Sequence, residues 1–194
     1  MVNQFFDHVF CINLERRTDR RQQAEEEFKK FGIEVEFVTG VDGTKLDIKP
    51  MISRDATMVS RGDLGCTLSH LKVAKIAKER GLKNYFVFED DVELANDFNE
   101  VFANYMNLVP NDWQMIYLGG NHDQPITEIN THIYRMSRTF TTHAFAAKSS
   151  IYDEMIAVLG QEDDKVDICI SSLHSKFPCY VCRPHIAFQK PGFS

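Results

Sequence analysis

The 194-residue sequence predicts a single α/β domain, spanning residues 1–194, in which a mostly parallel central sheet is flanked by helices. The length fits one domain, since typical domains hold about 100–200 residues. The composition is that of an ordinary globular protein, with 43% hydrophobic and 26% charged residues. Short apolar runs alternate with amphipathic stretches at a spacing typical of successive strand–helix units.

The expected strands are short apolar runs bounded by turn residues or charges. The run at residues 85–88 is apolar throughout, as expected of a central strand buried on both faces. The later strands are less regular in spacing than the early ones. The strands expected from this pattern are residues 8–14, 35–38, 85–88, 115–118, 132–134, 143–147 and 179–182.

Amphipathic helices are expected between most of these strands. The helix at 20–31 places Ala24 and Phe28 on one face and ends at Gly32. The long helix that opens at Ser60 begins with a capping-box pattern, because Asp63 follows three residues later. The expected helices are residues 20–31, 60–80, 98–108, 150–159 and 166–176.

Charge and composition exclude several classes of protein. A net charge of −6 argues against non-specific nucleic-acid binding, which needs clustered Lys and Arg. The first seven residues do not resemble a signal peptide, and no run approaches about 18 apolar residues, so any membrane contact is expected to be peripheral. The odd number of cysteines, five, suits a reducing compartment, and we expect a cytoplasmic protein. Cys179 and Cys182 are interpreted as core residues of a strand.

Three adjacent carboxylates, Glu89, Asp90 and Asp91, directly follow the strand at 85–88. Ligands in open α/β sheets bind beyond the carboxyl ends of strands. Two carboxylates spaced i, i+2 can hold one hard cation such as Mn²⁺ or Mg²⁺, which would also bind a diphosphate. Glu89 and Asp91 are the predicted ligands, and Asp90 is the substitute if the chain turns differently. The alternative is a solvated loop that starts a helix.

A cationic loop follows the first strand. Arg16, Arg17 and Arg20 lie just past its end, beside a predicted helix start, and Asn13 lies at the end of the strand itself. These four residues are predicted to surround the phosphates of a nucleotide. Arg61, at the start of the long helix, is a further candidate for a diphosphate contact. The alternative is a solvated helix terminus with local Arg–Asp pairs.

Together these segments resemble glycosyltransferase family 25, which includes bacterial lipooligosaccharide glycosyltransferases and collagen galactosyltransferases. No single motif is specific, but their order and spacing are. The motifs that carry the resemblance are INLERRTDR at residues 12–20, GCTLSH at 65–70, FEDD at 88–91, YLG at 117–119, THAF at 142–145, VD at 166–167 and the terminal QKPGFS at 189–194. The chain is short for the family, and a C-terminal extension is expected to be missing.

The resemblance implies a GT-A type fold, a UDP-linked sugar donor, a divalent metal and inversion at the anomeric carbon. The expected function is transfer of a hexose, galactose or glucose, to a hydroxyl of a glycan or protein, as in lipopolysaccharide biosynthesis. Two alternatives stay open. One is an inactive nucleotide-sugar-binding module of the same fold. The other is a different metal-dependent nucleotide enzyme, such as a nucleotidyltransferase, although residues 11–19 lack the glycine-rich loop usual in that class.

An inverting transfer needs a base for the acceptor hydroxyl, and Asp167, at the start of a helix, is the predicted base. A first-turn carboxylate that favours the helix dipole is the alternative interpretation, and Asp163 or Asp164 is the substitute base. His143 is a candidate phosphate contact or third metal ligand, and His185 is a candidate late metal ligand. A satisfied core or edge histidine is the alternative for each.

Overall fold

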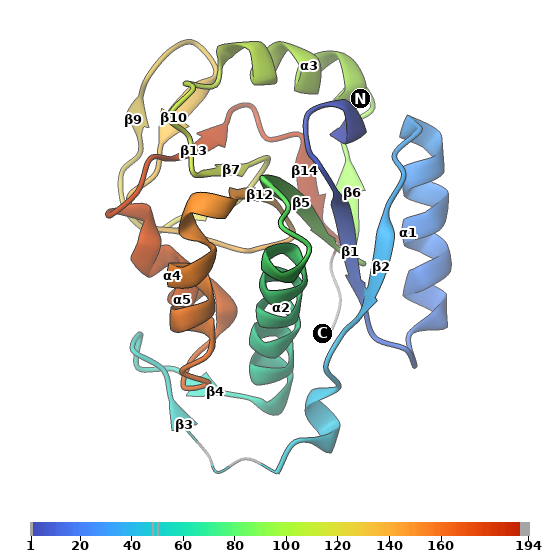
Figure 1. The fold of residues 1–194 in the computed structure, drawn as a ribbon, viewed down its shortest axis with the longest axis vertical. Helices are drawn as coiled ribbons and strands as arrows, with labels where there is room; N and C mark the ends of the chain where they lie inside the picture. Colours follow the sequence, from blue (N-terminus) through green and yellow to red (C-terminus); the bar gives the residue numbers. More distant parts are fainter. Residues whose placement is uncertain (1, 48, 50, 191–194) are drawn as a thin grey trace.

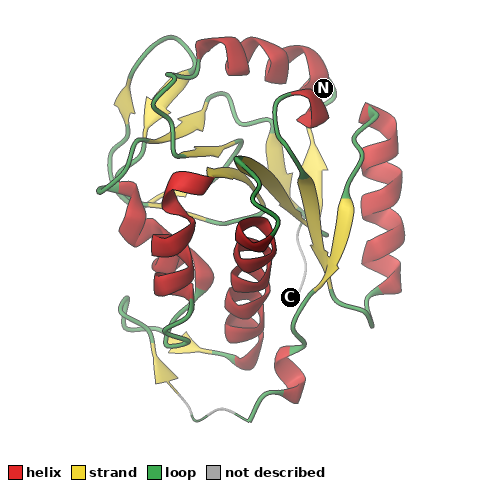
Figure 2. Ribbon diagram, in the orientation of Figure 1, coloured by secondary structure: helices red, strands yellow, loops and turns green. Residues whose placement is uncertain are grey.

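The central strands bury both of their faces, and successive side chains divide between two hydrophobic cores. The computed structural model describes residues 2–47, 49 and 51–190. In strand β5 (Asn84–Glu89), Phe86 and Phe88 lie in one core, whereas Tyr85 and Val87 lie in the other. Helices cover each face, so the domain is a three-layer α/β/α sandwich (Figure 1, Figure 2).

One eight-stranded sheet forms the middle layer, in the order β2-β1-β5-β12-β7-β13-β10-β9. Its strands are β1 (Val9–Asn13), β2 (Glu36–Thr39), β5, β7 (Met115–Tyr117), β9 (Thr127–Glu128), β10 (Ile133–Arg135), β12 (Ala144–Lys148) and β13 (Cys179–Cys182). The strands β2, β1 and β5 are parallel, as the sequence predicts.

Beyond β5 the expected mostly parallel arrangement gives way to a mixed sheet. Strand β12 runs antiparallel to both β5 and β7, and β10 is antiparallel to β13 and β9. The chain between β7 and β12 contains only short strands and loops. A parallel pair needs a long crossover, usually a helix, whereas an antiparallel neighbour does not. The missing crossover helix therefore accounts for the reversal.

The five α-helices of the described residues begin and end close to their expected positions. They are α1 (Thr18–Phe31), α2 (Arg61–Glu79), α3 (Phe98–Leu108), α4 (Tyr152–Leu159) and α5 (Val166–His174). The capping box is confirmed, since Ser60 and Asp63 each accept a hydrogen bond from the other's backbone N–H. Helix α1 ends at Gly32, whose φ of 63° is left-handed. Short 3₁₀ turns cover Val2–Gln4 (η1), Gly43–Lys45 (η2) and Ser149–Ile151 (η3).

The two faces of the sheet carry different helices. Residues of α1 and α3 belong to one core, and residues of α2, α4 and α5 belong to the other. Cys179 and Cys182 are fully buried in β13 and lie in different cores. Both thiols are free, which confirms the interpretation of this pair as core residues. None of the described helices is long and apolar enough to cross a membrane.

Three small ribbons were not expected from the sequence. Strand β6 (Val92–Leu94) pairs with β14 (Ala187–Gln189), and in Figure 1 the two run side by side between β5 and α1. The other ribbons pair β3 (Met51–Ile52) with β4 (Met58–Val59) and β8 (Asn121–His122) with β11 (Thr139–Phe140). The β6–β14 ribbon brings Gln189 next to the acidic segment. Residues 191–194 of the expected terminal motif lie outside the described residues.

Candidate active site

The carboxyl ends of β1 and β5 lie next to each other because the two strands are parallel and in register. Asn13, the last residue of β1, donates from Nδ2 to Asp90 Oδ2 over 2.7 Å. The same amide also donates to the carbonyl of Arg17 over 3.1 Å. Asn13 therefore connects the acidic segment to the cationic loop at residues 16–20, for which the sequence analysis predicts nucleotide contacts.

Arg20 joins the two aspartates of the acidic segment. Its Nη1 lies 3.1 Å from Asp90 Oδ1 and 3.1 Å from Asp91 Oδ2. All three side chains are largely buried, with the Arg20 side chain 12% exposed. A charge-assisted hydrogen bond is stronger where water is excluded. Arg20 thus fixes the orientation of both carboxylates and offsets part of their negative charge.

Asp91 keeps one oxygen without a protein partner. Its Oδ1 is buried and has no hydrogen bond among the described residues, whereas Oδ2 accepts from Arg20 and, over 3.3 Å, from Gln189. Burial raises the pKa of Asp91 to about 6, and the neighbouring charge of Glu89 adds to the rise. A buried, unpaired carboxylate oxygen in a negative environment fits a divalent cation.

Glu89 is held from three sides through one oxygen. Its Oε1 lies 3.1 Å from His70 Nε2 and accepts from Thr142 Oγ1 over 2.8 Å. The Sγ of Cys66 lies 4.0 Å from the same oxygen. Burial disfavours the charged carboxylate, but the hydrogen bonds and charges of its neighbours outweigh burial and lower the pKa of Glu89. Oε2 has no hydrogen bond within the described part of the chain.

Two cavities meet at this carboxylate. The first, about 830 Å³, has an apolar wall formed by Ile12, Leu14 and Val41. Its polar lining includes Arg16, Arg17, Arg20, Asp42, Glu89, Asp90 and Asp91. Apolar side chains and clustered arginines in one cavity match the two halves of a nucleotide, a base and a phosphate group.

The second cavity, about 890 Å³, is more polar. Its lining residues include Ser60, Asp63, Thr141, Thr142, Lys165, Asp167 and Gln189. Gly62, Cys66 and Glu89 line both cavities, so they form a common wall. Hydroxyl, amide, ammonium and carboxylate groups around one hollow suit a ligand rich in hydroxyl groups.

Asp167 lies in the second cavity, in the first turn of α5. Burial raises its pKa, while the backbone N–H groups of Ile168 and Thr141 and the charge of Lys165 act in the opposite direction. One carboxylate oxygen accepts from its neighbour Ile168 N over 2.9 Å. By contrast, Asp164 is fully buried and bonded to Ser53, and Asp163 pairs with Arg54 outside either cavity.

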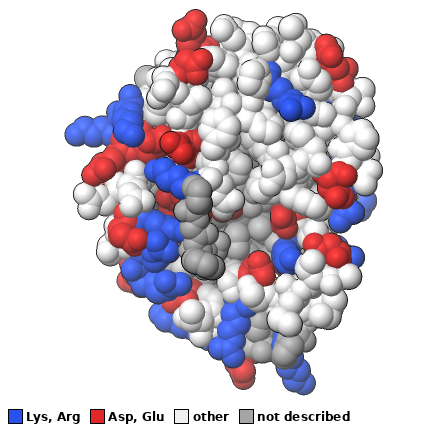
Figure 3. All heavy atoms as spheres, turned by 180° about the vertical axis from the view of Figure 1, so that it is seen from behind, with Lys and Arg blue, Asp and Glu red and all other residues white. Residues whose placement is uncertain are grey.

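Of the remaining candidate arginines, two line the first cavity and one does not. Arg16 and Arg17 line the first cavity, and each also forms the local ion pair of the alternative interpretation, with Asp42 and Asp19 respectively. Arg61 is exposed in the first turn of α2 and lines neither cavity. On the face in Figure 3, basic side chains gather beside acidic ones along one side of the molecule.

The two candidate histidines lie away from both cavities. His143 is 4% exposed, and its Nε2 lies 3.1 Å from the carbonyl of Ala187, so it bridges β12 to β14. His185 lines a separate cavity and its ring lies 5.6 Å from that of His122. Neither residue is brought together with Glu89 and Asp91, although the backbone carbonyl of His143 accepts from Glu89 N.

Several residues of the site do not stand out in the sequence. Gln189 reaches Asp91 only through the β6–β14 ribbon, and Lys165 reaches the second cavity through a loop. Cys66 and His70 carry a signal that sequence reasoning did not use. They are spaced i, i+4 on one helix, so both side chains can face the end of the same strand.

Comparison with known proteins identifies the family. The model of glycosyltransferase family 25 (LPS biosynthesis protein) matches residues 6–167, and the chain belongs to this family. A solved structure with the same fold is a glycosyltransferase involved in the glycosylation of the major capsid of PBCV-1. The two share 8% identity with a TM-score of 0.57, over 96% of this chain and 93% of that chain.

Relatives within the family differ in their described activity. Human procollagen galactosyltransferase 2 is 33% identical over 129 residues, which cover 59% of this chain and 21% of the relative. Human inactive glycosyltransferase 25 family member 3 is 30% identical over 138 residues, which cover 63% of this chain and 23% of the relative. The match thus covers about a fifth of the length of these curated relatives.

Proposed function

We propose that this chain transfers a hexose from a UDP-sugar to an acceptor hydroxyl, with a divalent metal and inversion at the anomeric carbon. The observation that carries the proposal is the pair of cavities that share Glu89 as a wall. A single displacement needs a donor and an acceptor side by side, and one common wall provides that arrangement. The name of the galactosyltransferase relative supports galactose as the transferred sugar.

The nucleotide is assigned to the first cavity. Ile12, Leu14 and Val41 would contact the base, and Arg16 and Arg17 would contact the phosphates. Phosphate binding by arginine is bidentate and strong where the site is partly buried. Asp19, the local partner of Arg17, is exposed and would compete only weakly with a phosphate, whereas Asp42, the partner of Arg16, is 15% exposed and lines the same cavity.

Mn²⁺ or Mg²⁺ would be held by Asp91 Oδ1 and Glu89 Oε2, the carboxylate oxygens that lack a protein partner in the described residues. Such an ion stabilises the negative charge of a departing diphosphate. Asp90 has both oxygens engaged, by Asn13 and Arg20, and is assigned to positioning. His70 and Thr142 hold Glu89 in place through Oε1.

The acceptor is assigned to the second cavity, with Asp167 as the base. Its raised pKa increases its affinity for a proton, which suits removal of a proton from a hydroxyl near neutral pH. Asp63 and Lys165 line the same cavity and would hydrogen bond other hydroxyl groups of the acceptor. A glycan or a hydroxylated protein side chain fits this description.

A second candidate, a nucleotide-sugar-binding module without turnover, is favoured by the 30% identity to a relative described as inactive. Release of the donor's own nucleotide from a panel of UDP-, GDP- and CMP-sugars, with and without Mn²⁺, separates the two. Transferase activity predicts Mn²⁺-dependent release of UDP that falls at least about 100-fold in Asp91→Asn. Asp163→Asn, on the exposed Arg54 pair, is the control and is expected to retain turnover. Binding of UDP-sugar without release of the nucleotide from any of the donors would favour the binding module.

A further inference from the structure

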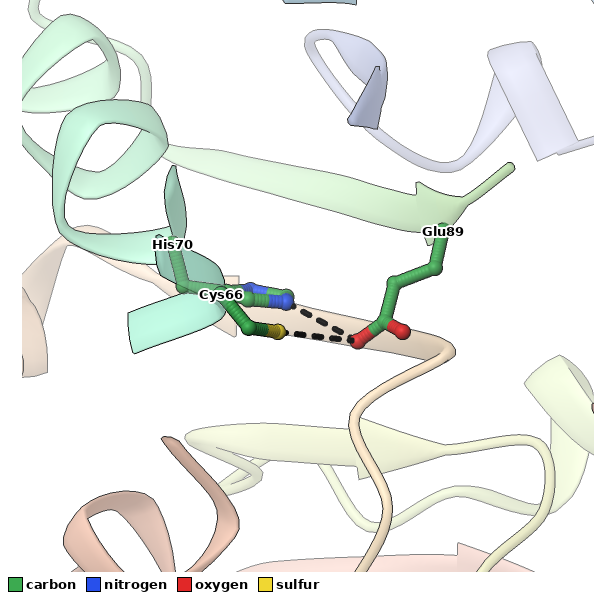
Figure 4. Close-up of side chains that lie close together, drawn as sticks. All are labelled: Cys66, His70 and Glu89. Carbon is green, nitrogen blue, oxygen red and sulfur yellow. Dashed lines mark hydrogen bonds and ion pairs between the residues drawn. The ribbon is translucent and has the colours of Figure 1, made fainter. Parts of the chain in front are cut away.

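Cys66, His70 and Glu89 bring a sulfur, a nitrogen and an oxygen ligand to one point. The three atoms, Cys66 Sγ, His70 Nε2 and a Glu89 carboxylate oxygen, all lie within 4.8 Å of one another. Cys66 and His70 project from successive turns of α2, and Glu89 ends β5, so both α2 side chains point at the same carboxylate (Figure 4). No other such cluster of three occurs among the described His, Cys, Asp and Glu residues.

We propose that Cys66, His70 and Glu89 form a binding site for Zn²⁺ or a similar borderline metal ion. It lies beside the Mn²⁺ position assigned to Asp91 Oδ1 and Glu89 Oε2, and Glu89 would contribute its other oxygen, Oε1. Thiolate and imidazole ligands select zinc, cobalt or copper, whereas Mg²⁺ and Mn²⁺ prefer oxygen ligands. Zinc binds sulfur at about 2.3 Å and nitrogen at about 2.0–2.1 Å. Cys66 Sγ and His70 Nε2 lie 4.0 and 3.1 Å from Glu89 Oε1, so the three side chains would have to close around one ion to reach such distances.

The charge of the surroundings favours a cation at this point. Burial raises the pKa of the Cys66 thiol, and the negative charges of Glu89, Asp167, Asp91 and Asp63 add to the rise. The same negative potential attracts a divalent ion. Binding would replace the thiol proton, which passes to solvent, and would leave Zn²⁺ neutralised by one thiolate and one carboxylate.

The position is also open to ligands from solution. His70 is 2% exposed and stacks on Phe145, so one side of the cluster is closed and held in place. Cys66 is half-buried, and it lines both cavities together with Glu89. Three protein ligands with a fourth position facing a cavity is the pattern of zinc sites that bind water or a substrate group. The proposal concerns metal binding and does not depend on the proposed transfer reaction.

Cobalt titration of the chelator-treated protein tests the site, because a Cys thiolate on Co²⁺ gives a charge-transfer absorption band in the near ultraviolet. The expected result is one equivalent of Co²⁺ with this band, displaced by Zn²⁺. Cys66→Ala removes the band, and the matched variant Cys169→Ala, outside the cluster, retains it. Asp91→Asn also retains the band, although the proposed function predicts that it loses Mn²⁺-dependent turnover. Absence of the band in the folded protein, or its persistence in Cys66→Ala, would overturn the assignment.

A second measurement needs no variant. Cys66 is the described cysteine that is not fully buried, so a thiol-alkylating reagent should modify it first in the native protein. One equivalent of Zn²⁺ is expected to slow this modification at least tenfold, as mapped by mass spectrometry of the digested protein. An unchanged rate with saturating Zn²⁺ would show that the thiol is not a ligand.

Discussion

The guanidinium of Arg20 lies 3.1 Å from Asp91 Oδ2, yet the pKa of Asp91 remains raised, at about 6. One ion pair therefore does not offset the burial of this carboxylate and the charge of Glu89 beside it. A carboxylate that resists ionisation in the folded protein is a group that a bound cation would stabilise.

Asp91→Asn is expected to make the ligand-free protein more stable at pH 8. A raised folded pKa means that the folded state holds its proton more tightly than the unfolded state, so stability is lost as pH rises from about 4 to 6. A shift of about two units corresponds to about 2–3 kcal/mol, which the neutral amide removes. Urea unfolding at pH 8 and pH 4 measures the effect, which should be near zero at pH 4. A variant that is less stable than the parent at pH 8 contradicts this prediction.

Asp167→Asn is expected to lower kcat at least about 100-fold if Asp167 is the base, with little change in the KM for the donor. Because burial raises the pKa of Asp167, the parent's kcat should rise with pH as this group deprotonates. The variant should lose that acidic limb. Steady-state rates of the parent and the variant across a series of acidic to neutral pH values provide the measurement.

The control for Asp167 is Asp63→Asn, which changes another carboxylate of the same cavity. The Asp63→Asn substitution is expected to raise the KM for the acceptor more than it lowers kcat. An Asp167→Asn variant that keeps the parent's kcat and pH profile would remove Asp167 from the role of base.

Glu27→Ala is expected to destabilise the fold by about 1–3 kcal/mol, because it leaves the N–H of Leu94 without its acceptor. Glu27 is 4% exposed and accepts from Leu94 N over 2.8 Å, which ties α1 to β6. Burial opposes its charge, but Lys30 and Leu94 outweigh burial and lower the pKa of Glu27. The stability that Glu27 provides should therefore be present above about pH 4.5 and decline as pH falls further.

Urea unfolding at pH 7 and pH 3 measures the effect of Glu27→Ala. The matched control is Glu26→Ala, an exposed neighbour on the same helix, which should change stability by less than about 0.5 kcal/mol. Equal effects of the two substitutions would contradict the assignment of Glu27 as the acceptor for β6.

Gly43→Ala is expected to damage the first cavity and the stability of the fold together. A Cβ at Gly43 would lie 1.9 Å from the carbonyl oxygen of Arg61, so η2 and the start of α2 would have to separate. Such overpacking costs about 1–3 kcal/mol. Thermal unfolding and UDP titration should show a lower Tm and weaker binding.

Gly81→Ala serves as the comparison for Gly43. Its φ of 64° disfavours a side chain, but no atom lies within 4 Å of the added Cβ. It should lower the Tm without changing the affinity for UDP, since Gly81 is remote from both cavities. A Gly43→Ala protein with normal UDP affinity would argue against η2 as a wall of the nucleotide site.

The early strands and all five helices could be predicted from the sequence because each depends on local patterns. The apolar run of β5 and the Ser60–Asp63 cap are examples, and both hold in the structure. The order of the later strands in the sheet depends on which strand edges remain free to pair. A hydrophobic pattern along the sequence does not specify which edge a strand joins. The direction of β12 is the clearest case.

The part of the candidate site that lies at the carboxyl ends of parallel strands could be predicted from the sequence. Asn13 and Asp90 are 77 positions apart, yet parallel pairing of β1 and β5 brings them into contact, as the positions of the polar residues indicate. Gln189 depends on a two-stranded ribbon of six residues, too short to be recognised from periodicity. The positions of the His143 and His185 rings could not be predicted, because a single polar residue near a strand end does not indicate toward which side its ring points.

The shared wall of Gly62, Cys66 and Glu89 limits how this protein can be redesigned or can diverge. Any substitution at these three residues changes the volume of both cavities. Under the proposed function, acceptor preference and nucleotide affinity would therefore change together. Under the proposed assignment, the acceptor preference alone would be adjusted at residues that line only the second cavity, such as Ser60, Thr141 and Lys165. Libraries of variants aimed at new acceptors should therefore vary residues that line only the second cavity and keep Gly62, Cys66 and Glu89 unchanged.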